Sequence, residues 1–219
     1  MSKTPLARAT KPRRLVIATR SEHKLRELRE LLDLPYAELV SLDDLGVDGD
    51  PVEDGLTFEA NASKKARWAA RATNLPALAD DSGLEVEALG GAPGVRTRRY
   101  AGEHATDADN NRKLLAALDG VQPEERNARY VCALAFAEPD ERGPRGGLNV
   151  ITRRGIVRGR IARTPRGMAG FGYDPIFEPE GEPPGGRTFG QWSAEAKNAI
   201  SHRGRAARRM ALVLRGMGF

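Results

Sequence analysis

Apolar and polar positions near the start of the chain predict a strand, a turn, a helix and a second strand. Residues 15–19 (LVIAT) form a β-branched run that is typical of a buried strand. Over residues 22–32 leucines recur at helical spacing, which predicts an amphipathic helix that Ser21 can cap. Residues 37–42 predict the next strand. A strand that leads through a short polar turn into a helix points backbone N–H groups at an anion.

Two further helices are predicted in the middle of the chain. Thr57 can cap a helix that runs to about residue 73, and Thr106 can cap another over residues 107–118. Residues 43–55 precede the first of these helices. They combine acidic side chains with glycines and a proline, which predicts a loop.

Strand patterns follow. Residues 128–137 (ARYVCALAFA) are almost entirely apolar and predict a buried strand. This run holds Cys132, the one cysteine of the sequence, so no disulfide can form within the chain and a buried, unreactive thiol is expected. Residues 148–152 and 155–161 predict a hairpin, with two arginines at its exposed turn.

The C-terminal part combines an aromatic loop with a helical region. Residues 167–177 (GMAGFGYDPIF) mix glycines and aromatic residues with one acid, and residues 178–186 predict a flexible loop. Residues 193–216 predict a helical region, in two pieces around Ser201.

Two adjacent carboxylates follow an apolar run at the centre of the chain. Residues 75–79 are largely apolar, and Asp80, Asp81, Ser82 and Gly83 come directly after them. Neighbouring carboxylates that are buried repel each other and lose their hydration, so this arrangement is costly for folding. In open α/β sheets ligands bind just beyond the carboxyl ends of strands, which is where we expect the two acids to lie. The alternative is an acidic turn without a functional role.

Composition narrows the class of protein. The sequence has 219 residues, of which 40% are hydrophobic and 30% charged, enough apolar material for a sizeable core. Residues 1–14 carry five basic residues and no acidic ones, so the net charge of +5 lies in this segment. We therefore expect residues 1–13 to be a disordered basic extension and residues 14–219 to form one folded domain. No apolar segment has the length of a membrane span, and no signal peptide is recognised, so we expect a cytoplasmic protein without membrane association.

Several side chains have the chemistry that a bound nucleotide requires. Lys24 lies in the first turn of a predicted helix, where it opposes the helix dipole and is better explained by a phosphate. Glu53 and Asp54 are candidate ligands of a hard cation. Phe171 and Tyr173 offer faces for stacking on a base. The donors that could contact its edge are Lys197, His202 and Arg203. The alternative for each is structural: a solvated lysine or acid, core aromatics in a tight turn, or a structural histidine.

Five stretches of the sequence resemble the inosine triphosphate pyrophosphatase family, enzymes that hydrolyse non-standard purine nucleoside triphosphates. They are LVIATRSEHKLREL, GLTFEANASKKAR, LADDSGLEVEALGGAPGVRTRRYAG, GFGYDPIF and KNAISHRGRA, and they span residues 15–206. Their common order and spacing are far more specific than any one motif. The resemblance implies an α/β fold with a long twisted mixed β-sheet, flanking helices and a central active-site cleft between two lobes.

The resemblance also implies roles for particular residues. Asp81 would be the general base and a metal ligand, with Asp80 supporting it and Glu53 as a second ligand of Mg²⁺. Lys65 would face the phosphates as the third member of the catalytic group. The residues that would bind substrate are Thr19, Arg20, Ser21, Glu22, His23, Lys24, Ser82, Phe171, Gly172, Tyr173, Asp174, Lys197, His202 and Arg203. Those up to Lys24 would form the phosphate loop, and those from Phe171 onward the base and sugar pocket.

Family members cleave between the α- and β-phosphates, release a nucleoside monophosphate and pyrophosphate, and are commonly homodimers. For this chain the resemblance implies a Mg²⁺-dependent pyrophosphatase for ITP, dITP and XTP. Two alternatives are the same chemistry on modified pyrimidine triphosphates, and a nucleic-acid-binding protein that uses the basic extension and the arginine-rich C-terminal helix. The balanced charge of residues 15–219 disfavours the second. The chain departs from the family pattern at Ser21, where Asn is usual, and at Ala60, where Glu is usual.

Overall fold

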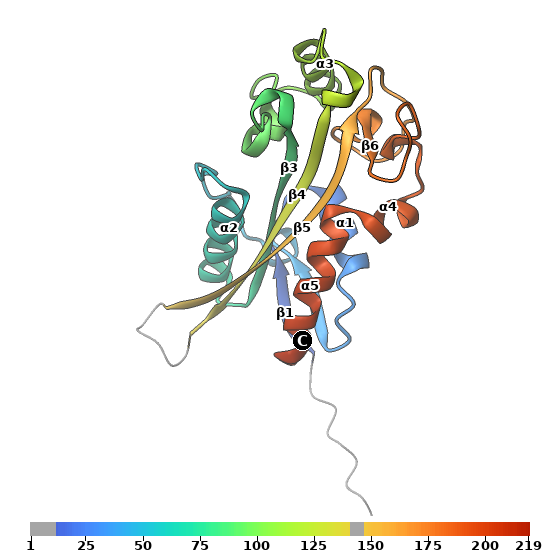
Figure 1. Cartoon of the computed structure of the whole chain (residues 1–219). Helices are drawn as coiled ribbons and strands as arrows, with labels where there is room; N and C mark the ends of the chain where they lie inside the picture. The colour runs from blue at the N-terminus through green and yellow to red at the C-terminus, as the bar shows by residue number, and fades with distance from the viewer. Residues whose placement is uncertain (1–11, 141–146) are drawn as a thin grey trace, which may run out of the picture.

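The structure is a computed structural model that describes residues 12–140 and 147–219. Within these residues six strands form one sheet in the order β2-β1-β3-β4-β5-β6. The strands are β1 (Arg13–Ile17), β2 (Ala37–Ser41), β3 (Ala77–Val86), β4 (Asn127–Pro139), β5 (Leu148–Ile161) and β6 (Phe177–Pro179). The α-helices are α1 (Glu22–Leu31), α2 (Phe58–Thr73), α3 (Asp107–Ala117), α4 (Ala194–Ile200) and α5 (His202–Gly216) (Figure 1).

The sheet is mixed, as the resemblance implied. β1 pairs in parallel with β2 and β3, whereas β3, β4, β5 and β6 pair antiparallel in that order. The long strands β3, β4 and β5 run from a lower body, which contains β1, β2, α2 and α5, to an upper part with α3 and β6 (Figure 1). This confirms the α/β fold with a long mixed sheet and flanking helices, arranged as two lobes.

Three apolar cores hold the elements together. In the lower body, α1 and α5 cover one face of the sheet, and the core there includes Leu15, Ile17, Leu28, Leu78 and Leu214. α2 covers the opposite face, with a core that includes Val16, Ala62, Ala66, Ala69 and Ala79. The third core lies in the upper part and includes Leu84, Leu114, Tyr130, Phe177 and Phe189. Because strand residues alternate between the first two cores, neighbours in β1 and β3 face different helices.

The prediction of a hairpin within residues 148–161 is wrong. These residues form the continuous strand β5, and Arg153 and Arg154 pair with β4 in its middle. The hairpin is instead formed by β4 and β5. Gly155, which directly follows the two arginines, serves packing: a Cβ there would lie 2.1 Å from the carbonyl oxygen of His202. Glycine at this position therefore lets the start of α5 approach the strand.

The predicted helix caps are confirmed. Each capping side chain accepts a hydrogen bond from the backbone N–H three residues later, and these residues are Ser21, Thr57 and Thr106. Ser201 ends α4 and caps α5, as the pattern predicted. This break turns the first residues of α5, His202 and Arg203, toward the sheet, where His202 stacks on Tyr130 of β4.

The predicted basic extension falls mostly outside the described residues, since residues 1–11 are not among them. Arg13, which we assigned to the extension, is instead the first residue of β1. Its guanidinium donates to the carbonyl of Met217 at 2.6 Å and lies 3.9 Å from the centroid of the Phe219 ring. In the part of the chain that the structure describes, no helix is both long and apolar enough to cross a membrane.

Candidate active site

The acid pair lies inside β3 rather than beyond its end. β3 continues to Val86, and Asp80 and Asp81 both pair with β4. The expectation that the acids follow the end of their strand is therefore wrong, although the parallel pairing of the neighbouring β1 with β3 does stop at Leu78. Because successive side chains of a strand point to opposite faces, the sheet separates the two carboxylates. The repulsion between adjacent acids that we inferred from the sequence is thereby reduced.

Asp80 faces α1 and α5, where it is buried between cations. Its Oδ1 lies 3.0 Å from Nζ of Lys24, and its Oδ2 accepts two hydrogen bonds from Arg203 at 3.1 Å. Burial acts to raise the pKa of Asp80, but the charges of Lys24 and Arg203 hold that pKa well below its ordinary value. Ser82 completes the cluster, donating to Asp80 and accepting from Arg203. Asp80 is therefore an ionised anchor for two cations.

Asp81 faces α2 and has the properties of a base. Its Oδ1 accepts from Nζ of Lys65 at 3.1 Å and its Oδ2 from the amide of Asn61 at 3.3 Å. Burial raises the pKa of Asp81, and the charge of Lys65 only partly opposes this. A raised pKa brings a carboxylate closer to the range in which a general base works at neutral pH. Burial opposes the charge of Lys65, but Asp81, Asp80 and Glu53 together raise the Lys65 pKa, so the ammonium stays protonated.

The two predicted metal ligands share one cation in this structure. Nζ of Lys65 lies 3.1 Å from Oδ1 of Asp81 and 3.1 Å from Oε1 of Glu53. The carboxylates are thus close enough to hold one positive ion between them, and their oxygen atoms suit Mg²⁺. Among residues 12–140 and 147–219, no three acidic, histidine or cysteine side chains gather into a fuller set of ligands. A Mg²⁺ ion here would complete its shell with water and substrate oxygens, as it commonly does.

Neighbouring acids are engaged elsewhere. Asp54, the other candidate ligand from the sequence, pairs with Lys64 at 2.6 Å on the surface. Glu59, which precedes the unusual Ala60, pairs with Arg154 at 3.5 Å. These contacts leave Glu53 and Asp81 as the carboxylates around Lys65.

The predicted phosphate loop reaches the acid pair through Lys24. Ser21 caps α1 by accepting from the backbone N–H of Lys24, and Thr19 accepts from the N–H of Ser21 at 3.2 Å. The two hydroxyl groups thus shape the turn that presents Lys24 to Asp80. Serine at position 21 keeps the capping interaction although it lacks the amide donor of asparagine.

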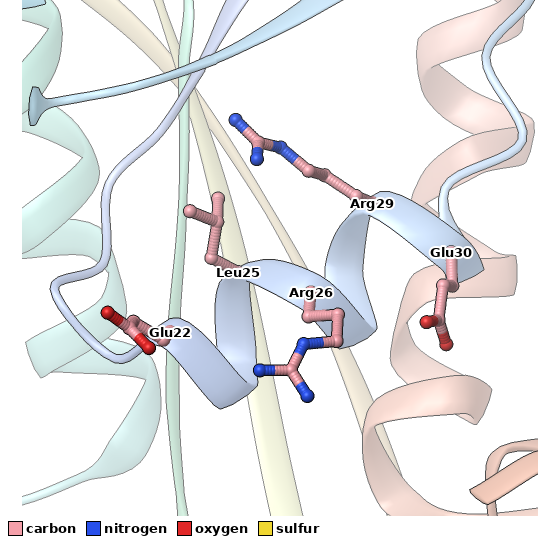
Figure 2. Close-up of a pocket in the computed structure, with 5 residues that line it drawn as sticks. All are labelled: Glu22, Leu25, Arg26, Arg29 and Glu30. Atoms are coloured by element: carbon pink, nitrogen blue, oxygen red, sulfur yellow. The ribbon is translucent and has the colours of Figure 1, made fainter. Parts of the chain in front are cut away.

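Two residues of that loop lie apart from the acid pair. Arg20 binds the acidic loop of residues 43–55, where its partners are Asp43, Val47, Gly49 and Asp50. Glu22 is exposed on the outer face of α1, where it lines a shallow pocket with Leu25, Arg26, Arg29 and Glu30 (Figure 2). Neither Asp80 nor Asp81 lines this pocket. That Arg20 and Glu22 bind substrate stays a prediction.

The predicted base pocket gathers side chains from the loop before β6 and from α4 and α5. Asp174 is buried and accepts from Nζ of Lys197 at 2.6 Å and from the N–H of Phe171 at 2.9 Å. The Lys197 ammonium lies 4.8 Å from the centroid of the Phe171 ring, and the guanidinium carbon of Arg203 lies 5.7 Å from it. Three of the predicted residues thus gather around a fourth, Phe171.

His202 lies beside this group. Its ring stacks on Tyr130, with the centroids 4.6 Å apart and the planes at 8°. Burial lowers the pKa of His202 well below its ordinary value, and the charges of Arg203 and Lys197 lower it further, so the ring is neutral. Its buried Nδ1 has no hydrogen-bond partner among the described residues. Such an atom can donate one bond to a ligand, or accept one, depending on the tautomer.

Gly172 and Tyr173 do not join the pocket as expected. Tyr173 is 3% exposed in the upper core, and its hydroxyl donates to the carbonyl of Thr97 at 2.8 Å. Its ring faces are covered, so the prediction that Tyr173 stacks on a base does not fit the structure. The N–H of Gly172 donates to Asp107 at 2.6 Å. An aromatic residue in a glycine-rich loop can belong to a core as well as to a site, and Tyr173 belongs to the core.

Three residues that contribute to the site were not assigned a role from the sequence: Glu27, Asn61 and Tyr130. Glu27 of α1 bridges the cationic side chains of α4 and α5, pairing with both. Helical spacing could have revealed two of the three, because Glu27 and Asn61 lie three or four residues from Lys24 and Lys65 on the same helix face. Tyr130 gave no signal, since an aromatic residue in a buried strand is normally part of the core.

Fold and site together define an α/β protein in which carboxylates and cations meet in the middle of a long mixed sheet, beside a group of aromatic rings. Such a combination suits a ligand with a polyanionic part and a flat ring. The chain belongs to the Ham1 family, whose profile matches residues 15–213. This confirms the resemblance drawn from the motifs.

Individual relatives agree. The chain is 52% identical over 192 residues to a dITP/XTP pyrophosphatase of Syntrophobacter fumaroxidans, covering 88% of this chain and 78% of that one. It is 50% identical over 194 residues to a dITP/XTP pyrophosphatase of Geobacter sulfurreducens, covering 88% and 92%. A solved HAM1 protein from Coxiella burnetii has a TM-score of 0.81 to this structure at 42% identity, covering 93% of this chain and 99% of that chain.

Proposed function

We propose that the protein is a nucleoside triphosphate pyrophosphatase that hydrolyses the non-standard purine nucleotides ITP, dITP and XTP. The observation that carries the proposal is the setting of Asp81. It is a buried carboxylate held by Asn61 and Lys65 on one face of β3, while Lys24 and Arg203 surround its neighbour on the other face. The two similar bacterial proteins named dITP/XTP pyrophosphatases support the same reaction.

In this reaction Asp81 accepts a proton from a water molecule. The water oxygen forms a bond to one of the two phosphorus atoms of the α–β anhydride as the bridging P–O bond breaks. The products are the nucleoside monophosphate and pyrophosphate. Lys24 and Lys65 stabilise the negative charge on the phosphate oxygens, and in phosphoryl transfer such electrostatic stabilisation and positioning supply most of the catalysis.

Mg²⁺ is the cofactor that the site would hold. Asp81 and Glu53 would be its protein ligands, because they already share the Lys65 ammonium. When bound, the ion neutralises phosphate charge and polarises oxygen atoms. Lys65, which pairs with both carboxylates in this structure, would then be available to the phosphate oxygens.

Selection of the base follows from the donors around Phe171. A 6-keto purine offers a ring oxygen that accepts hydrogen bonds, and Lys197 and Arg203 are obligate donors. The amino group of adenine would leave these donors unpaired, and mispairing of buried polar groups can discriminate by about 10⁴. His202 offers a further nitrogen, since its Nδ1 lacks a protein partner in the described part of the chain.

The experiment that tests the function is pyrophosphate release from a panel of nucleoside triphosphates, with Mg²⁺ and with EDTA. We expect metal-dependent turnover of ITP, dITP and XTP, with ATP and GTP much slower. Faster turnover of modified pyrimidine triphosphates would move the assignment to that substrate class. Absence of turnover combined with salt-dependent binding to DNA or RNA would favour the nucleic-acid-binding alternative.

The quaternary structure stays a prediction. We expect a homodimer, as is common in the family that the motifs resemble. Light scattering coupled to gel filtration would measure the mass in solution, and twice the 23.8 kDa of one chain is the expected result.

A further inference from the structure

Phe171, the aromatic platform of the proposed base pocket, is covered by three other side chains. The imidazole of His23 stacks on it, with the ring centroids 5.4 Å apart and the planes at 18°. The cationic groups of Lys197 and Arg203 lie 4.8 and 5.7 Å from the same centroid. A base that stacks on a face of Phe171 covered by one of these neighbours has to replace that neighbour.

The stack with His23 leaves no room for a third ring. Packed carbon atoms keep about 3.5 Å between them, so a ring inserted between two others needs about 7 Å between the outer pair. The centroids of His23 and Phe171 are only 5.4 Å apart. His23 and a purine base thus cannot both stack on this face of Phe171.

The three covering groups differ in how firmly they are held. Lys197 is buried and pairs with Asp174 at 2.6 Å, and Arg203 is buried and pairs with Asp80 at 3.1 Å. His23 is exposed in the first turn of α1, and across residues 12–140 and 147–219 its stack on Phe171 is the one polar or aromatic side-chain contact that holds it. Moving His23 breaks one exposed stacking interaction, whereas moving either cation would take an ion-pair partner from a buried carboxylate.

We propose that His23 determines the affinity of the base site by competing with the purine base for one face of Phe171. Binding of the base moves the imidazole aside. The inference rests on the proposed function, because it takes a purine nucleotide as the ligand. The proposal assigns His23 to the base end of the site, whereas the motif resemblance assigned it to the phosphate loop. Every purine base has to displace the same imidazole, so His23 sets how tightly nucleotides bind. The choice among bases is left to the hydrogen-bond donors that face the base edge.

The test is a series of substitutions that changes the strength of this stack. The dissociation constant of inosine monophosphate, measured by titration calorimetry, should fall by about two- to tenfold in His23→Ala, the range that one stacked pair is worth. It should rise in His23→Trp, because the larger ring competes more strongly. The ratio of kcat/KM for ITP to that for ATP should stay within about twofold of wild type, because discrimination by polar groups at the base edge is untouched. Arg26→Ala, an exposed change on the same helix, is the matched control and should bind as wild type does.

Two results would overturn the competition. Weaker binding by His23→Ala than by wild type would show that the imidazole supports the base instead of competing with it. Equal binding across alanine, histidine and tryptophan would show that it does neither. Turnover of ITP by the same preparations separates this inference from the proposed function. An active wild type with either result refutes the competition alone, whereas a wild type that neither binds inosine monophosphate nor hydrolyses ITP refutes both.

Discussion

The two ends of the proposed site are built on different principles. At the acid end, defined by Asp80, Asp81, Lys24, Lys65 and Glu53, opposite charges contact each other at 3.0–3.1 Å. At the base end, defined by Phe171, Asp174, Lys197 and His202, stacked rings surround one buried ion pair, and one buried nitrogen has no partner within the described residues.

This difference indicates how each end responds to a ligand. The cations of the acid end already pair with carboxylates, so a triphosphate has to replace these carboxylates as their partner. At the base end, Nδ1 of His202 has no partner among the described residues, so a hydrogen bond from a ligand to this nitrogen would displace no other hydrogen bond. Changes at the acid end should therefore affect turnover and stability, and changes at the base end should affect the choice of nucleotide.

The largest expected effect is on turnover in Asp81→Asn. The amide keeps the size of the side chain but cannot accept the proton from water, so kcat for ITP should fall by at least about 100-fold. Binding of inosine monophosphate should persist. Asp48→Asn, an exposed change in the acidic loop, should keep wild-type kcat. Activity above a hundredth of wild type would count against Asp81 as the base.

The next effect distinguishes the two acids by stability. Asp80→Asn should lower the free energy of unfolding by about 3–5 kcal/mol, because the buried Arg203 and the half-buried Lys24 lose their shared carboxylate. Asp81→Asn should cost much less, since burial raises the pKa of Asp81 and its ionised form is already disfavoured. Urea denaturation measures both. Equal losses would contradict the view that only Asp80 is a structural anchor.

At the base end we expect a smaller effect, on selectivity. His202→Phe should keep the stack on Tyr130 and remove the unpartnered nitrogen. The preference for ITP over ATP should fall by about tenfold, the value of one hydrogen bond, while kcat for ITP changes less. A nucleotide panel at fixed Mg²⁺ measures this ratio. If kcat falls and the ratio is constant, His202 supports the fold or the chemistry and does not select the base.

The subtlest effect is a shift in pH dependence. Because the base must be ionised, kcat/KM should fall as the pH falls through the pKa of Asp81, which burial raises above the ordinary aspartate value. The charge of Lys65 lowers that pKa, so Lys65→Ala should move the acid limb of the profile to higher pH, besides reducing activity. An acid limb that stays in place in Lys65→Ala would show that a different group titrates there.

Local patterns in the sequence determined most of the secondary structure. The caps at Ser21, Thr57 and Thr106 and the break at Ser201 were predicted because each depends on contacts within a few residues. The hairpin within residues 148–161 was predicted wrongly because the pattern indicates an exposed turn at Arg153 and Arg154, whereas both pair with β4 in the middle of β5. The adjacent Gly155 is explained by the helix that packs on it.

The site shows the same division. The sequence identified the acid pair together with Lys65, Lys24 and Arg203, and the structure brings these three cations around the pair. Tertiary structure alone decided that Asp80 and Asp81 point to opposite faces within β3, so that one is an anchor and the other has the setting of a base. It also decided that Tyr173 belongs to the core and that His23 covers Phe171. The physical reason is that a cap or an amphipathic face depends on near neighbours, whereas contacts across a sheet depend on register and on which helix covers each face.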